Sequence, residues 1–427
     1  QTRNTTAKIT SQHGLIYDKL TRRFGAEQAG QYARVNQRAI AEYRRIVREL
    51  AIDCALEERA AYLYSTLDED ALRAEAHAAR ALGLNAQFTA QTALPFPVKG
   101  AVRFEEQAQF HPLRFLAAVA EQVTVYEQTL VLRVDGGRVE TDRGTVRARH
   151  VVFACHFPFV NAPGYYFINV PGLYFLRMHQ ERSYVLALKN APQLDGMYYG
   201  VDPEGLSFRN AGEYLLLGGG NHRTGENSAG GRYELLRQAA RRCYPDSREA
   251  AHWSAQDCIP LDGVPYIGVY APSVPNWYVA TGFQKWGMTS SMAAAMLISA
   301  RITGREDPDG AVFSPRRFKL PAAGANLLED GKQTVKGLSR QLFTSGRAEL
   351  EALPSGHGGV VELDGEKVGA YRDETGELFL VSTRCPHLGC QLEWNPDEKS
   401  WECPCHGSRF DHRGRLLEGP AQTHLTE

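Results

Sequence analysis

The chain lacks an excess of charge of either sign, and it lacks a long apolar run. Its 48 lysines and arginines nearly balance its 49 aspartates and glutamates, which leaves a formal net charge of -1. Such a balance produces no field that would attract nucleic acid or an anionic membrane. The longest apolar stretch, near residues 291–302, contains small residues and an arginine. It is shorter than the roughly 18 residues that a membrane-spanning helix needs, so we expect neither a nucleic-acid partner nor a transmembrane segment.

The N-terminal segment lacks the apolar stretch of a secretory signal peptide, which favours a cytoplasmic location. It also lacks an initiating methionine, because the sequence begins Gln-Thr-Arg-Asn. We therefore expect the gene product to begin upstream. The 427 residues are too many for one ordinary hydrophobic core, which predicts two or three domains.

Hydrophobic periodicity predicts how the secondary structure is distributed along the chain. Residues 12–85 show helical spacing, with possible breaks at Gly25 and at residues 52–54. Helices are also predicted at 231–243 and 289–302. Strands are predicted at 123–126, 130–134, 139–141, 146–155, 184–188, 214–217, 277–280, 360–363, 367–371 and 378–382.

These patterns divide the chain into three parts. For residues 1–318 the pattern of predicted helices and strands indicates a domain of α/β plus α+β class. Residues 319–345 have weak periodicity and many polar residues, which indicates a linker. Residues 346–427 have short strands separated by tight turns, which predicts a small antiparallel all-β domain.

Four of the eight cysteines crowd into 21 positions near the C-terminus. They belong to two short boxes, C-P-H-L-G-C beginning at residue 385 and C-P-C-H-G-S beginning at residue 403. A Rieske [2Fe–2S] centre needs two thiolates on one iron and two imidazoles on the other, and one Cys and one His from each box meet that need. The predicted ligands are Cys385, His387, Cys403 and His406.

The cysteine cluster has two alternatives to a Rieske centre. A structural zinc site also uses Cys and His, but zinc modules usually space their pairs as C-x₂₋₄-C and H-x₃₋₅-H. Here the order is Cys, His, Cys, His with gaps of one and two residues, which does not fit. A metal-free disulfide knot is the second alternative.

Both boxes, their Gly and Pro residues, and Gly419-Pro420 after them resemble the Rieske family, in which a proline-bearing loop covers the cluster. This resemblance implies a disulfide between Cys390 and Cys405 beside the cluster. Cytosolic disulfides are uncommon, so this expectation goes against the base rate for a cytoplasmic protein.

Several segments of the large domain resemble the d-amino-acid-oxidase-like family of FAD-dependent oxidoreductases, and in particular members with a C-terminal Rieske domain. They are residues 5–14 (TTAKITSQHG), 104–112 (FEEQAQFHP), 151–154 (VVFA), 261–268 (LDGVPYIG) and 280–289 (ATGFQKWGMT). In the last segment a strand ends at Gly282 and a helix opens at Gly287, and bare N–H groups at a helix N-terminus suit an electron-rich ring edge. The resemblance implies that FAD is bound by Thr5, Thr6, Gly282, Gly287, Met288 and Thr289. Lys285 and Trp286 could face the flavin.

The chain departs from this family in one respect. The dinucleotide fingerprint G-x-G-x-x-G, with an acidic residue about 20 positions later, is absent. We therefore expect the chain to begin after the missing βαβ unit and to bind FAD weakly unless that unit is restored. No catalytic residue is assigned. Arg177, Arg182 and Arg209 are interpreted as solvated surface residues, although one of them could hold a substrate carboxylate.

The resemblance implies an oxidoreductase with FAD and a [2Fe–2S] cluster. It would oxidise a small organic molecule, expected at a C–N bond, and exchange single electrons with a redox donor or acceptor through the cluster. The alternative is an electron-transfer protein whose large domain mainly docks a partner. Rieske oxygenase chemistry would need a mononuclear iron site with two His and a carboxylate, and residues 1–318 show no such close constellation.

Overall fold

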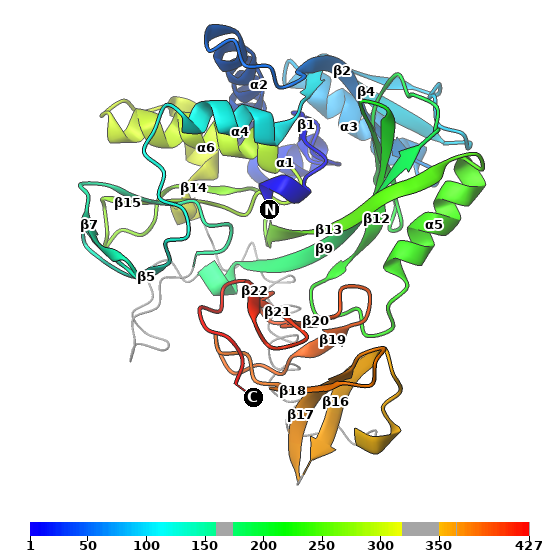
Figure 1. Cartoon of the computed structure of the whole chain (residues 1–427). Coiled ribbons are helices and arrows are strands. Elements are labelled where there is room, and N and C mark those ends of the chain that lie inside the picture. Colours follow the sequence, from blue (N-terminus) through cyan, green and yellow to red (C-terminus); the bar gives the residue numbers. More distant parts are fainter. Residues whose placement is uncertain (159–173, 318–349, 364, 427) are drawn as a thin grey trace.

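The computed structural model describes residues 1–158, 174–317, 350–363 and 365–426. Figure 1 shows a large domain in which helices and a curved sheet surround the N-terminus, and a smaller β domain beneath the long strands of that sheet. The predicted linker, residues 319–345, lies outside the described residues.

The centre of the large domain is a sheet whose described part has nine strands. Its order is β1 (Lys8–Ile9), β4 (Gly100–Gln109), β2 (Glu57–Ser65), β10 (Gly196–Gly200), β11 (Ser207–Ala211), β12 (Tyr214–Arg223), β9 (Met178–Lys189) and β13 (Arg248–Pro260), with β3 (Ala86–Thr89) paired to β4. The β2–β10 pair is parallel and the other pairs are antiparallel. The sheet is therefore mixed, as the α/β plus α+β prediction implies.

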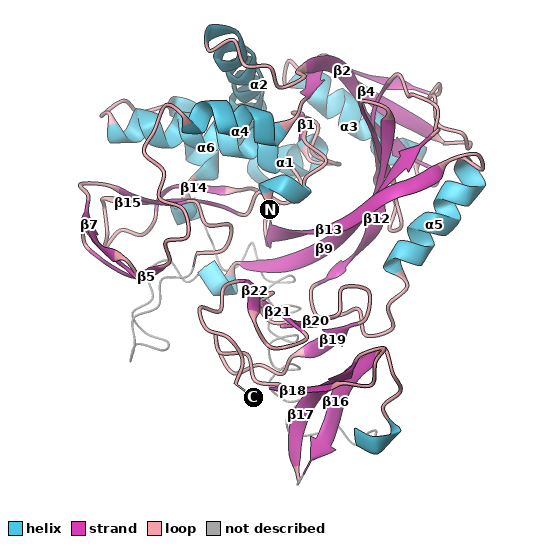
Figure 2. Ribbon diagram, viewed as in Figure 1, coloured by secondary structure: helices cyan, strands magenta, loops and turns pink. Residues whose placement is uncertain are grey.

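Six helices of the described residues belong to the large domain (Figure 2). They are α1 (Tyr17–Phe24), α2 (Ala26–Glu49), α3 (Glu69–Ala81), α4 (Pro112–Ala120), α5 (Arg232–Cys243) and α6 (Gly287–Ile302). The apolar faces of α1, α2, α3 and α6 share one buried core with strands β1 and β4. Helix α5 covers β9 and β12 through Tyr233, Leu236 and Ala240.

Two small sheets complete the large domain in the described residues. One consists of β14 (Tyr266–Val269), β15 (Trp277–Thr281) and β8 (Val151–Phe153), with β15 and β8 parallel. The other is the meander β5 (Val131–Asp135), β6 (Arg138–Thr141) and β7 (Gly144–Arg147). Strand β15 leads directly toward α6, as the sequence predicted.

The C-terminal domain is built from two antiparallel sheets in its described part. The first contains β16 (His357–Leu363), β17 (Glu366–Arg372) and β18 (Leu378–Ser382), and the second contains β19 (Glu393–Asn395), β20 (Ser400–Glu402), β21 (Arg409–Asp411) and β22 (Leu416–Glu418). Trp394, Trp401 and Phe410 fill its core together with the cysteines of the two boxes. This agrees with the predicted antiparallel all-β class.

Several elements differ from the sequence prediction, among them strands β4 and β13 of the large sheet, which were missed. Strand β2 interrupts the predicted helical region. It was missed because its last five residues are all buried, and a continuously buried strand has no alternating pattern that would distinguish it from a helix. Helix α4 was missed, and residues 123–126 do not form the predicted strand. The break at Gly25 is confirmed, since Gly25 with φ 85° ends α1 and precedes α2.

Among the residues that the structure describes, none of the helices combines the length and the hydrophobicity needed to cross a membrane.

Candidate cofactor sites and the junction between them

The two cysteine boxes fold into loops with the same hydrogen-bond pattern. In each loop the N–H of the first cysteine donates to the carbonyl five residues later, at 2.9 Å for Cys385 and 2.8 Å for Cys403. A glycine N–H donates back to the carbonyl of that cysteine, at 2.8 Å for Gly389 and 2.9 Å for Gly407. Both glycines have positive φ, 76° and 80°, a conformation that side chains disfavour. The G in each box is thus a requirement of the turn.

The loops bring the predicted ligands together. The rings of His387 and His406 lie 4.9 Å apart between centroids, and the thiols of Cys385 and Cys403 are close enough to share a hydrogen bond. The sulfurs of Cys390, Cys403 and Cys405 also lie within 4.8 Å of one another. Cys390 and Cys405 form a disulfide, however, so neither can ligate a metal. The predicted pairing of these two cysteines is present.

The electrostatics of this site suit a metal centre. The Cys403 thiol and hydrogen bonds from the His387 backbone and from Ser408 hold the pKa of Cys385 at about 7, below its usual value of 9. Burial lowers the pKa of His387 to about 4, so its ring is neutral and able to ligate at physiological pH. Its Nδ1 is buried and has no hydrogen-bond partner among the described residues. Buried polar atoms are rarely left in that state, which fits a ring nitrogen directed at iron.

A second candidate site is a cavity of about 810 Å³ in the large domain. The first turn of α6, the end of β15, the segment before β1 and the middle of β9 and β13 form its walls. Gly287 opens α6 there, and a Cβ added to it would meet no atom of the described residues within 4 Å. The N-terminal end of helix α6 therefore borders the cavity.

The walls of the cavity carry charged and aromatic side chains. Burial alone would lower the pKa of Lys285, but Asp257 and Glu181, 3.5 and 3.7 Å from its Nζ, outweigh burial and raise it. Trp286 stacks on His13 with a centroid distance of 5.0 Å and contacts Tyr199 edge-on. The cavity therefore combines an ordered ammonium group with flat apolar surfaces.

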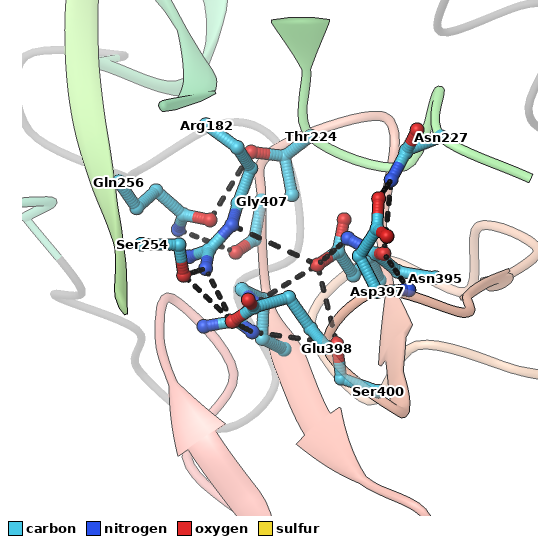
Figure 3. A network of polar contacts seen from close by, with 12 residues as sticks. Arg182, Thr224, Asn227, Ser254, Gln256, Asn395, Asp397, Glu398, Ser400 and Gly407 are labelled. Atoms are coloured by element: carbon cyan, nitrogen blue, oxygen red, sulfur yellow. Dashed lines mark hydrogen bonds and ion pairs between the residues drawn. The ribbon is translucent and has the colours of Figure 1, made fainter. Parts of the chain in front are cut away.

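The β domain sits directly against the large domain through a buried network of charges (Figure 3). Arg182 in β9 is 1% exposed, and its guanidinium lies 2.9 Å from Glu398, 3.5 Å from Glu418 and 3.9 Å from Glu402. Arg409 of the β domain pairs with the same three glutamates at 3.0–3.3 Å. Two arginines, one from each domain, thus neutralise most of the charge of three carboxylates that all belong to the β domain.

Two glycines let the backbones of the domains approach closely. A Cβ on Gly407 would lie 2.7 Å from the side chain of Gln180, and a Cβ on Gly225 would lie 2.6 Å from the backbone nitrogen of Pro404. One glycine comes from each domain. Because no larger residue fits at either position, the second cysteine box is held against the sheet itself.

Comparison with known families decides what the two parts are. The family described as "FAD dependent oxidoreductase" matches residues 1–301, and the Rieske [2Fe-2S] domain family matches residues 347–427. The chain belongs to the FAD dependent oxidoreductase family and carries a Rieske domain. The large domain is hereafter the FAD domain. These matches do not test the predicted domain boundaries, 1–318 and 346–427, which stay a prediction.

Relatives share the whole chain or the Rieske domain alone. The YhfW protein of Bacillus subtilis, named as a putative Rieske 2Fe-2S iron–sulfur protein, is 38% identical over 440 residues, which cover 98% of this chain and 84% of YhfW. The cytochrome b6-f complex iron-sulfur subunit 2 of Trichormus variabilis is 47% identical over 118 residues, 27% of this chain and 65% of that protein.

Solved structures resemble the FAD domain in fold. Glycine oxidase from Geobacillus kaustophilus has a TM-score of 0.57 at 19% identity and covers 74% of this chain and 88% of its own. L-Amino acid deaminase from Proteus myxofaciens has a TM-score of 0.56 at 16% identity and covers 75% and 85%. At these identities the likeness concerns the fold alone.

Most residues predicted to bind flavin do line the cavity. Thr5, Thr6, Gly282, Gly287 and Met288 form part of its wall, as do Lys285 and Trp286. Thr289 does not, because its hydroxyl is used by the N–H and the carbonyl of Thr10, at 2.9 and 2.8 Å. Thr289 thus fastens α6 to the chain that follows β1.

The three arginines require a correction. Arg182 and Arg209 are buried and not solvated, and none of Arg177, Arg182 and Arg209 lines the cavity. Arg209 donates to the carbonyls of Thr6 and Phe110, at 2.7 and 2.9 Å. A buried guanidinium needs such partners, so these arginines hold the structure together.

The residues at the junction were not predicted from the sequence. Gln180, Arg182, Ser254 and Gln256 share one face of the neighbouring strands β9 and β13, where Arg182 pairs with Gln256 in register. We call these four residues the docking face. In the sequence these residues show only as polar side chains two positions apart within a strand. A strand whose polar face meets solvent has the same pattern, so the pattern could not indicate a domain contact.

Substituting Gly287 by valine is expected to weaken FAD binding at least about tenfold, the effect of roughly 1.4 kcal/mol. The new side chain would project into the open space over the first turn of α6 without striking the protein. Titration of apoprotein with FAD, followed by fluorescence, measures the affinity. Thermal unfolding of the apoprotein should change little. An unchanged affinity would mean that flavin does not approach this turn.

Substituting Ser408 by alanine is expected to lower the cluster potential, and Phe410→Tyr to raise it. The Ser408 hydroxyl lies near the Cys385 sulfur and lowers the pKa of that thiol, and donors to sulfur stabilise the reduced cluster. Phe410 is fully buried in the core that contains the cysteines but offers no donor. We expect shifts on the order of tens of millivolts. They correspond to less free energy than a whole charge-assisted hydrogen bond, because only the difference in bond strength between the two oxidation states changes the potential. Voltammetry that finds both potentials unchanged would show that neither side chain affects the cluster.

Proposed function

We propose that the protein oxidises a small amine or amino acid at its C–N bond in the cavity of the FAD domain. We further propose that Cys385, His387, Cys403 and His406 hold the [2Fe–2S] cluster, through which electrons pass one at a time. Flavin accepts two electrons from an organic substrate and can release them singly, and a Rieske cluster carries one. The observation that carries the proposal is that Gln256, which lines the cavity, also donates a hydrogen bond to Gly407 of the second cysteine box.

The residues around the cavity support amine chemistry. Asp257 is the acidic residue of the cavity wall, 3.5 Å from the ammonium group of Lys285, and its carboxylate can pair with the positive nitrogen of a substrate. Trp286 and Tyr199 offer flat faces that attract cations and exclude water. Lys8, whose pKa burial and Arg209 lower to about 7, supplies a second amino group to the wall.

The relatives in fold agree with this choice of bond. Glycine oxidase, L-proline dehydrogenase and L-amino acid deaminase are named for substrates that carry an amino nitrogen on a carbon. Their identity to this chain is low, so they support the class of bond and not a particular substrate.

A matched panel of substrates tests the proposal. The full chain, loaded with both cofactors, is mixed anaerobically with glycine, alanine or proline, and separately with glycolate or lactate, which carry C–O in place of C–N. The amino compounds should bleach the flavin absorbance and the hydroxy acids should not. Bleaching by hydroxy acids alone would overturn the C–N assignment. Failure of amines and hydroxy acids alike would favour the alternative, an electron carrier whose FAD domain docks a partner.

A further inference from the structure

Side-chain amides of the docking face donate hydrogen bonds to main-chain carbonyls of the second cysteine box. The Nε2 group of Gln180 donates to the carbonyl of His406, the predicted cluster ligand. The Nε2 group of Gln256 donates to the carbonyl of Gly407 at 2.8 Å and to Oε1 of Gln180 (Figure 3 shows Gln256 and Gly407). Thr224 fixes the other end of the Gln256 amide through a 3.1 Å hydrogen bond to its Oε1.

The same two glutamines reach the cavity of the FAD domain. Gln256 lines it directly. His156 also lines it, and its buried ring lies close to the Gln180 side chain. His156 has a φ of 67°, unusual for a residue with a side chain, and the Thr281 hydroxyl donates to its carbonyl. Such backbone strain persists only where surrounding contacts impose it. A hydrogen-bonded route through Gln256 and a second route of contact through His156 and Gln180 therefore connect the cavity with the cysteine box.

His406 and His387 differ in what covers them. The His406 ring is 3% exposed and lies edge-on to Phe157 and Phe175 of the FAD domain, with centroids 6.3 and 6.0 Å away. His387 is only partly covered. Among the described residues, the His406 imidazole therefore packs against the FAD domain, whereas His387 is the less covered of the two.

The junction between the domains is held by buried charged groups, and separating them would cost free energy. Glu402 is fully buried and accepts from Arg409, Asn395 and the N–H of Gly225, at 3.0, 2.9 and 3.1 Å. Separating the domains would leave Arg182 without the carboxylates that pair with it. Unpaired buried charges are costly, so the docked arrangement is the working one.

We propose that Gln256 and the pair His156–Gln180 form a bridge that carries single electrons between the flavin cavity and the cluster at His406, within one molecule and without undocking of the Rieske domain. With both cofactors bound, each transfer would take one electron from the reduced flavin and add one electron to the cluster. The proton of the flavin is released separately. The inference rests on the proposed function, because these electrons are the ones that the substrate supplies.

Photoreduction tests the bridge without any substrate. The full chain, loaded with FAD and cluster, is illuminated with EDTA as the sacrificial electron donor, and the loss of the oxidised-cluster absorbance is followed in time. Gln180→Leu and Gln256→Leu remove the hydrogen bonds of the bridge at nearly unchanged volume. Tyr233→Phe is the matched control, because it removes a 2.7 Å interdomain hydrogen bond to Glu398 that lies outside the bridge. Small-angle scattering and the EPR spectrum of the reduced cluster report docking and cluster integrity in every variant.

In the unaltered chain the transfer should be first order, with a rate constant independent of protein concentration. Each leucine variant should slow it about tenfold, within the range found for residues that orient metal ligands. Tyr233→Phe should leave the rate constant unchanged. Voltammetry of the chain loaded with cluster alone should show a lower potential in Gln180→Leu, since a donor to the ligand loop is lost.

Three results would overturn the bridge. They are a rate constant that rises with protein concentration, leucine variants as fast as the unaltered chain, and an equal loss of rate in Tyr233→Phe. A leucine variant that undocks is replaced by Gln256→Glu, which retains the Thr224 contact but cannot donate to Gly407. Because light supplies the electrons, a wrong substrate class leaves this experiment unaffected, whereas it would fail the panel of amines.

Discussion

Replacing His406 by alanine is expected to yield a chain without the red-brown colour of a Rieske protein. The unaltered chain should contain about two irons and two acid-labile sulfides, and the variant close to none. The reason is geometric, since the second iron would keep only the imidazole of His387 and could not complete its coordination. Colorimetric iron and sulfide assays on purified protein, together with EPR of the reduced sample, measure the loss.

The control for this variant is Cys54→Ala. Cys54 is a buried free cysteine in the core of the FAD domain, far in sequence from either box. Its substitution should leave iron and sulfide unchanged. Stoichiometric zinc without labile sulfide in the unaltered chain would contradict the assignment of the four ligands.

The second large effect is expected at the junction. Arg182→Met leaves three glutamates facing the single guanidinium of Arg409. Breaking a buried ion pair from one side typically costs about 3–5 kcal/mol. The cost should appear as undocking, because Arg182 belongs to the FAD domain and its three carboxylates belong to the Rieske domain. Calorimetry should therefore resolve two unfolding transitions in the variant where the unaltered chain shows one.

Arg237→Met is the matched control for this substitution. Arg237 pairs with Glu249 at 2.8 Å, but both lie near the surface of the FAD domain. An exposed pair contributes about 1 kcal/mol or less, so the single transition should persist. If Arg182→Met behaved in the same way, the buried network would not be what holds the domains together.

Acid should act on the same network. Burial opposes ionisation of Glu402 and Glu418, but Arg409 and Arg182 outweigh it and hold the pKa of both below the usual 4.5. A carboxylate with a lowered pKa in the folded state stabilises that state above the unfolded value, and the contribution disappears as pH falls through the lowered value. Docking should thus be insensitive to pH above about 4.5 and should weaken below it.

The sequence alone identified the features that depend on short stretches of chain. Each cysteine box is closed by hydrogen bonds within six residues, and its glycine is required by a local turn. The same holds for the passage from Gly282 to the start of α6. The spacing of the residues therefore identified the Rieske domain and the fold class, and the four ligands stay a prediction.

Tertiary structure decided the features that depend on distant partners. Strand β2 is buried at the centre of a sheet, so its apolar run carried no periodicity that could separate it from a helix. Arg182 meets Glu398 across 216 positions and Gln256 meets Gly407 across 151. Nothing in a single strand shows whether its polar face meets water or another domain. Only the folded chain shows that this face carries the Rieske domain, because burial and pairing of charge are properties of the assembled surfaces.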